Sequence, residues 1–71
     1  KMSMSEEEIK ELCDKNDWEA TDKHLRYLIE IYGDAGSVAS FVMPMLLNLR
    51  DQFNNGMRTD VLKRSIWEIE L

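Results

Sequence analysis

Two side chains in this sequence are of the types that nucleophilic catalysis uses, the thiol of Cys13 and the imidazole of His24. A histidine beside a cysteine can take the thiol proton, which leaves a thiolate that attacks carbonyl carbons. Such a site also needs a residue that orients the imidazole and donors that stabilise an oxyanion. No pattern in the chain supplies either, so we expect no catalytic residue and interpret Cys13 as a small buried apolar side chain.

Metal and phosphate chemistry lack their usual patterns as well. With one Cys and one His, the chain has neither an HExxH nor a CxxC spacing, which zinc sites and related centres use. Its three glycines are scattered, whereas a phosphate-binding loop concentrates them. No two carboxylates share an apolar helix face that would raise their pKa values. We therefore predict a non-enzymatic protein without a metal ion or a cofactor.

The length of the chain, 71 residues, suffices for a single domain over residues 1–71. A chain of this size buries only about 60% of its unfolded surface, so we expect a marginal stability. Because Lys1 precedes Met2, we expect residues 1–4 to be a tag remnant or a disordered start. The single cysteine cannot form an internal disulfide, which indicates a reducing compartment and predicts a cytoplasmic location.

The net charge of −5 arises in the first half of the chain. Residues 1–17 hold six acids and three bases, residues 18–36 hold four and two, and residues 37–71 hold four and four. Nucleic-acid binding relies on Lys and Arg that neutralise phosphates, so this balance disfavours a nucleic-acid partner. Residues 35–49 carry no charge, but a segment of this length is too short to span a membrane.

Cap signals and apolar periodicity divide the chain into helices. We predict an all-α fold, a small four-helix domain with helices near residues 5–15, 18–32, 38–54 and 59–70. In the first helix, Ser5 and Glu8 have the spacing of a capping box, and Met4 can pack on Ile9. The apolar stripe of this helix is narrow, which is typical of a short covering helix, and consists of Ile9, Leu12 and Cys13.

The helix over 18–32 begins at Asp17 or Thr21, both good caps, and is expected to end before Gly33. A spacing of 100° per residue places four apolar residues on one stripe, namely Leu25, Leu28, Ile29 and Tyr32. Tyr27 and Ile31 fall outside this stripe, four residues apart. They therefore need a second neighbour.

The helix over 38–54 contains the only proline, Pro44. Its apolar arc covers about two-thirds of the helical wheel, with a main part that consists of Val38, Phe41, Val42, Met45, Leu46, Leu49 and Phe53. Pro44 falls on the polar arc, where it would kink one continuous helix away from the core. The alternative is a break with Pro44 as the first residue of a new helix. The wide arc predicts a central helix that is packed on two sides, by the other helices alone or also by a second subunit.

The helix over 59–70 begins after Thr59, a good cap. Its expected stripe consists of Val61, Leu62, Ser65, Ile66 and Ile69. Trp67 points away from this stripe. Because tryptophan is enriched at binding hot spots, an exposed ring indicates a partner; the alternative is that the ring folds over a neighbouring helix.

The apolar residues outside the stripes predict a protein–protein interaction module. Its simplest form is a homodimer built around the helices over 18–32 and 38–54, because a twofold contact uses the same patch on both subunits. We expect the interface to consist of Tyr27, Ile31, Met43, Leu47 and Trp67.

Two other functions stay open. One is an acidic inhibitor, or a mimic of nucleic acid, that docks on a basic partner through Glu6, Glu7, Glu8, Glu11 and Asp14. The other is a helix-turn-helix regulator whose contacts to DNA phosphates come from Arg58, Lys63 and Arg64, although a net charge of −5 disfavours it. Salt distinguishes the three functions, because an apolar interface tolerates salt whereas charged interfaces weaken.

Overall fold

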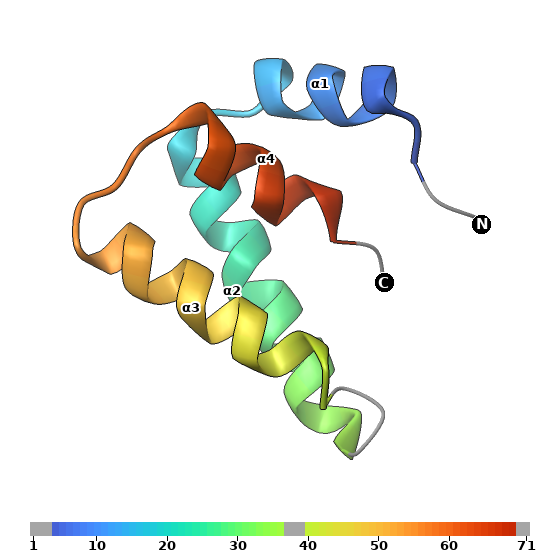
Figure 1. Cartoon of the computed structure of the whole chain (residues 1–71), viewed down its shortest axis with the longest axis vertical. Coiled ribbons are helices and arrows are strands. Elements are labelled where there is room, and N and C mark those ends of the chain that lie inside the picture. Colours follow the sequence, from blue (N-terminus) through green and yellow to red (C-terminus); the bar gives the residue numbers. More distant parts are fainter. Residues whose placement is uncertain (1–3, 37–39, 70–71) are drawn as a thin grey trace.

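A computed structural model of the chain describes residues 4–36 and 40–69 (Figure 1). Over these residues it contains four helices and no strand, which confirms the predicted all-α fold. The helices are α1 (Glu6–Lys15), α2 (Trp18–Asp34), α3 (Val42–Asn54) and α4 (Asp60–Glu68).

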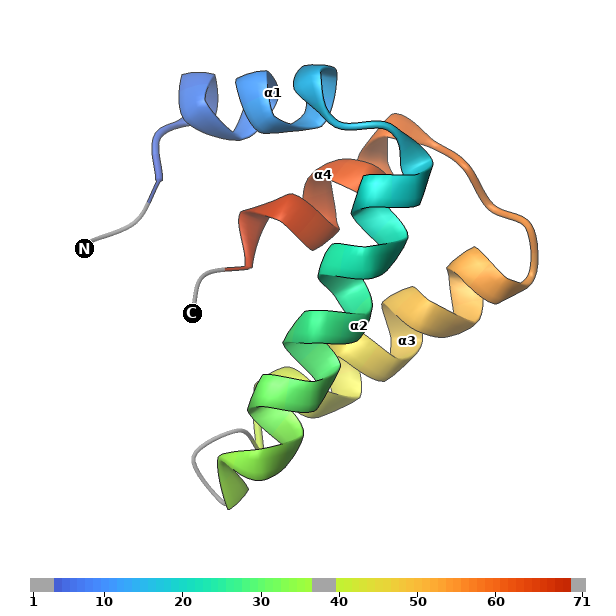
Figure 2. The same cartoon turned by 180° about the vertical axis from the view of Figure 1, so that it is seen from behind.

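The shortest helix, α4, is the centre of the arrangement, because it packs against α1, α2 and α3, while α2 also packs against α3. In Figure 1, α3 and α4 lie in front of α2, and Figure 2 shows α2 in front from the opposite side. The molecule measures 32 × 32 × 16 Å. Since the axes of packed helices lie about 8–10 Å apart, the shortest dimension of 16 Å corresponds to a slab of two layers of helices.

The core is a small cluster of aliphatic side chains from three helices. Its members are Leu25 and Leu28 of α2, Leu46 and Leu49 of α3, and Leu62 and Ile66 of α4. Ile9 of α1 is also buried. Phe53, which we expected in the core, is only half-buried and packs against the cluster.

The predicted cap of α1 is confirmed, and of the two caps considered for α2, Asp17 and Thr21, the helix uses Asp17. The Ser5 hydroxyl accepts a bond from the Glu8 N–H, and the Ser5 N–H donates to the Glu8 carboxylate. The Asp17 carboxylate accepts from the Ala20 N–H at 2.9 Å. The predicted end of α2 is too early, because the helix continues through Gly33 to Asp34 and the left-handed glycine is Gly36, with φ of 66°.

The start of α3 corrects the predicted helix over 38–54. Ser40 and Phe41 form a turn, and the helix begins at Val42; positions 38 and 39 lie outside the described residues. Pro44 is thus the third helical residue, where a backbone N–H would have no partner within the helix. Its ring therefore causes no kink, because no hydrogen bond of the helix is lost.

The packing of α4 corrects a second expectation, that the helix over 38–54 is the central one. Thr59 caps α4 as predicted, since its hydroxyl accepts from the Leu62 N–H at 3.1 Å. Of the two helices, however, α4 packs extensively against all three others, whereas α3 packs extensively against α2 and α4. The wide apolar arc of α3 is therefore partly uncovered: Phe41 is 90% exposed and Met45 is 46% exposed. On α4, Val61 is 75% exposed instead of buried.

Candidate protein-interaction surface

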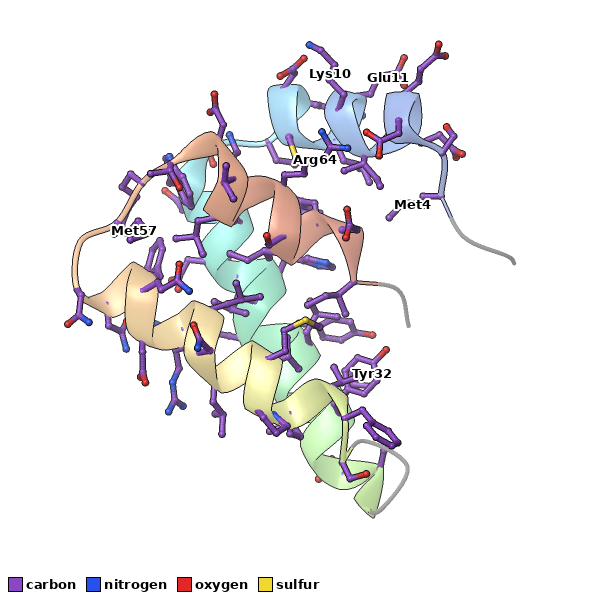
Figure 3. All side chains as sticks on the ribbon, viewed as in Figure 1. Met4, Lys10, Glu11, Tyr32, Met57 and Arg64 are labelled. Atoms are coloured by element: carbon purple, nitrogen blue, oxygen red, sulfur yellow. The ribbon has the colours of Figure 1, made fainter. Side chains whose placement is uncertain are left out.

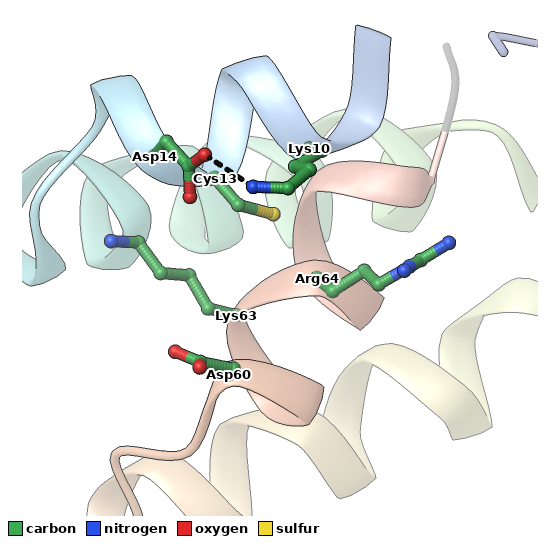
Figure 4. Close-up of a pocket in the computed structure, with 6 residues that line it drawn as sticks. All are labelled: Lys10, Cys13, Asp14, Asp60, Lys63 and Arg64. Carbon is green, nitrogen blue, oxygen red and sulfur yellow. Dashed lines mark hydrogen bonds and ion pairs between the residues drawn. The ribbon is translucent and has the colours of Figure 1, made fainter. Parts of the chain in front are cut away.

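Cys13 lies in a polar depression of about 390 Å³ between α1 and α4 (Figure 4). The depression is lined by Lys10, Cys13, Asp14, Asp60, Lys63 and Arg64. Burial raises the pKa of the Cys13 thiol, although Lys63 opposes this shift. A raised pKa keeps the sulfur protonated and lowers its reactivity as a nucleophile.

His24 lies outside this depression, on the flank of α2 that faces α4. Its ring stacks on Trp67, with ring centroids 4.1 Å apart and planes 5° from parallel. Burial lowers the pKa of the His24 imidazole. The described residues contain no group of three or more His, Cys, Asp and Glu side chains arranged to hold a metal ion.

Trp67 folds over α2, which is the second of the two arrangements considered from the sequence. Its indole N–H donates to the Thr21 hydroxyl at 2.9 Å, and this hydroxyl donates to the Asp17 carbonyl at 2.8 Å. Thr21 is fully buried. The polar edge and one face of Trp67 are thus engaged within the chain, and the ring is not a free anchor for a partner.

The other four residues of the predicted interface lie in different environments. Tyr27, Ile31 and Leu47 are exposed, whereas Met43 is half-buried and packs against the core. On α2, the helical spacing places Tyr27 and Ile31 on the same flank as His24, toward Trp67.

Leu47 lies on a different flank of the molecule. The spacing of α3 places it beside Arg50 and Asn54, which line a depression between α2 and α3 together with Arg26 and Ile29. The α2 side of that depression is the flank opposite to Tyr27 and Ile31. The structure therefore brings Tyr27 and Ile31 together but does not join Leu47 to them in one patch.

A more continuous apolar site lies where α2 and α4 end and α3 begins. This groove, which we call the junction groove, has a volume of about 320 Å³ and is lined by Tyr32, Val42, Met45, Ser65, Glu68 and Ile69. Figure 3 shows Tyr32 on the side of α2 toward the end of α4. Phe41, the N-cap residue of α3, directly precedes the groove residue Val42.

Sequence reasoning missed this site because it placed Phe41 and Met45 in the core of one long helix. Pro44 was the signal that could have located it. Proline is tolerated throughout the first turn of a helix, and a start two residues before Pro44 leaves Phe41 at the cap, outside the helical stripe.

The acidic residues proposed as a docking face are largely engaged within the chain. Glu6 pairs with Arg64 across α1 and α4, Glu8 belongs to the capping box, and Asp14 pairs with Lys10 at 3.0 Å. Glu7 and Glu11 are exposed, and Figure 3 shows Glu11 pointing away from α4.

The cations of the helix-turn-helix alternative are also engaged. The Arg58 guanidinium lies 3.6 Å from the centroid of the Phe53 ring and donates to the Phe53 and Met57 carbonyls. The Lys63 ammonium lies 5.6 Å from the centroid of a Trp18 ring. With Arg64 paired to Glu6, none of the three side chains extends freely toward a phosphate backbone.

No helix within residues 4–36 and 40–69 combines the length and the apolar character that crossing a bilayer requires. Comparison of the chain with protein families, with curated proteins and with solved structures finds no match.

Proposed function

We propose that this chain is a non-enzymatic protein-interaction module that binds its partner at the junction groove. The observation that carries the proposal is Phe41, which is 90% exposed and directly precedes the groove residue Val42. Burial of a phenylalanine side chain contributes about 1.5–3 kcal/mol relative to exposure in water. A partner that covers Phe41 gains this free energy, which the isolated chain leaves unused.

The side chains beside Phe41 suit a protein partner. Val42, Ile69 and Tyr32 are half-buried, and they give the groove an apolar floor. Met45 is flexible and polarisable, so it can adapt its shape to a bound side chain. A broad face of the slab, about 32 Å on each side, has room for the roughly 800 Å² that each partner buries in a standard interface.

The polar groups of the groove support binding rather than catalysis. The Ser65 hydroxyl donates to the Val61 carbonyl at 2.8 Å, which is a helical contact and not a contact with a general base. Among the described residues, Glu68 is the only charged one in the lining. A nucleophile activated by a neighbouring base, which covalent catalysis needs, is not formed by these two side chains.

A photo-crosslinking experiment tests the proposal. Benzoylphenylalanine is placed at position 41, 45 or 47, and the chain is irradiated in an extract of its native cells. We expect a discrete protein adduct from positions 41 and 45, and none from position 47, which lies on the opposite flank of α3. An adduct from position 47 alone would favour the interface predicted from the sequence, and no adduct from positions 41 and 45 would contradict the proposal.

A further inference from the structure

The junction groove lies at the carboxyl ends of two helices. Tyr32 belongs to the last turn of α2, and Glu68 and Ile69 stand at the end of α4. Neither helix has a basic residue in its last turn. The carboxyl end of a helix carries the equivalent of about half a negative charge. The two helix ends therefore make the groove more negative, and no basic side chain in their last turns offsets this charge.

The carboxylate of Glu68 adds to this field, because Glu68 lines the groove. The amino end of α3 opposes these negative charges, because Phe41 provides no side-chain cap for the first N–H groups. A helix amino end is equivalent to only about half a positive charge, so the balance stays negative. The groove is thus apolar on its floor and negative at its edge.

This combination fits the helix-in-groove mode of recognition. An amphipathic helix lays apolar residues at positions i, i+3 and i+4 into such a groove, and lysines or arginines beside them can reach helix carboxyl ends and carboxylates. A second copy of the chain fits less well. It also carries a net charge of −5, and a twofold contact would place the same negative groove edge on both sides.

We infer that the junction groove takes a cationic amphipathic helix of another protein, an inference that rests on the proposed function. Apolar side chains of this helix occupy the groove beside Phe41 and Met45. Its Lys or Arg residues neutralise Glu68 and the carboxyl ends of α2 and α4.

Two designed peptides of opposite charge test the inference. Each has about four helical turns with leucines on one face, and the other face is lysine in one peptide and glutamate in its counterpart. Binding of the labelled peptides to the full chain is measured by fluorescence anisotropy in about 0.15 M salt, near the physiological ionic strength. We expect the lysine peptide to bind at least about tenfold more tightly than the glutamate peptide.

Matched variants locate the binding. Met45→Ser should weaken the lysine peptide about tenfold, whereas Leu47→Ser, a similarly exposed position on the opposite flank of α3, should leave its affinity unchanged. Glu68→Gln should weaken it about two- to fivefold, as expected for one partly exposed ion pair. Glu11→Gln makes the same change in net charge on α1 and should have no effect.

The outcomes separate the inference from the proposed function. If both peptides bind equally and Met45→Ser weakens both, the inference of a cationic partner would be wrong. The proposal that the groove is a docking site would still be supported. Self-association of the chain in about 0.15 M salt that Phe41→Ser abolishes would have the same consequence, with a second copy as the partner. The inference would also be wrong if neither peptide binds, or if Met45→Ser does not change the binding. In that case the photo-crosslinking experiment tests the proposed function independently.

Discussion

Trp67, Thr21 and Asp17 form a chain of hydrogen bonds that connects the end of α4 to the first turn of α2. The Thr21 hydroxyl is fully buried and serves both as acceptor and as donor. A buried polar group that loses its partner costs about 1–3 kcal/mol. The position of the tryptophan therefore depends on one hydroxyl.

Substitution of this hydroxyl tests its role. Thr21→Val keeps the shape of the side chain but leaves the Trp67 N–H without its acceptor, so we expect the free energy of unfolding to fall by about 1–3 kcal/mol. Urea denaturation measures the change. In Trp67→Phe, which has no N–H to satisfy, the same Thr21→Val change should cost clearly less; equal costs in the two backgrounds would exclude the hydrogen bond as the cause.

His24 makes the stability depend on pH. Burial lowers the pKa of its imidazole in the folded state, whereas in the unfolded chain the imidazole has its ordinary pKa of about 6.5. Below that pH the unfolded state binds more protons, so the contribution of His24 is complete above about pH 6.5 and is lost as the pH falls through the folded pKa. Urea midpoints between about pH 7.5 and 5.5 should therefore decrease, and the decrease should be smaller in His24→Gln. An identical pH profile in both proteins would contradict this role of His24.

At the scale of the elements, the position of Pro44 in the first turn of α3 changes the effect that we expect from Pro44→Ala. In a continuous kinked helix, Pro44→Ala would restore a backbone hydrogen bond and stabilise the protein. In the first turn there is no bond to restore, while the rigid ring of Pro44 restricts the unfolded chain. We therefore expect Pro44→Ala to lower the free energy of unfolding by about 0.4–1 kcal/mol, as measured by urea denaturation. A gain in stability would favour the kinked helix.

Adjacent leucines of α3 test which face of this helix is in the core. Leu46 is fully buried and Leu47 is 36% exposed. Leu46→Ala should cost about 2–5 kcal/mol of unfolding free energy, and Leu47→Ala should cost less than about 1 kcal/mol because its side chain is already partly in water. Similar costs at both positions would mean that the face of α3 is assigned incorrectly.

These elements show which features a sequence can predict. The caps depend on residues within one turn. Those predicted at Ser5 and Thr59 are confirmed, and α2 begins at Asp17, one of the two caps considered for it. The predicted start of α3 was too early. A helical wheel can be drawn for any segment, so it does not test whether the whole segment is helical. The direction of Trp67 depends on Thr21, which lies 46 residues earlier, and the central place of α4 depends on how all four helices pack. Local patterns carry no information on such distant contacts.

The whole molecule is a thin slab with a small core, so much of its apolar surface stays near solvent. Six residues from three helices form the main buried cluster, and α1 is attached chiefly through α4. The surplus surface is not distributed as the sequence predicted, because Tyr27 and Ile31 lie on the flank of α2 toward Trp67, whereas Leu47 lies on the flank of α3 opposite to Met45. One self-complementary patch centred on Tyr27 and Leu47 is therefore not formed.

This distribution, together with the charge, predicts the oligomeric state. Each copy carries a net charge of −5, and at about 0.15 M salt charges still interact over roughly 8 Å. We expect sedimentation equilibrium to give a monomer over a hundredfold range of concentration, with Tyr27→Glu and Leu47→Glu unchanged in mass. In about 1 M salt, where the screening length falls to roughly 3 Å, the repulsion between groove edges is weakened while apolar contacts persist. Any association that then appears should be lost in Phe41→Ser; a salt-independent dimer that Leu47→Glu dissociates would instead establish the interface predicted from the sequence.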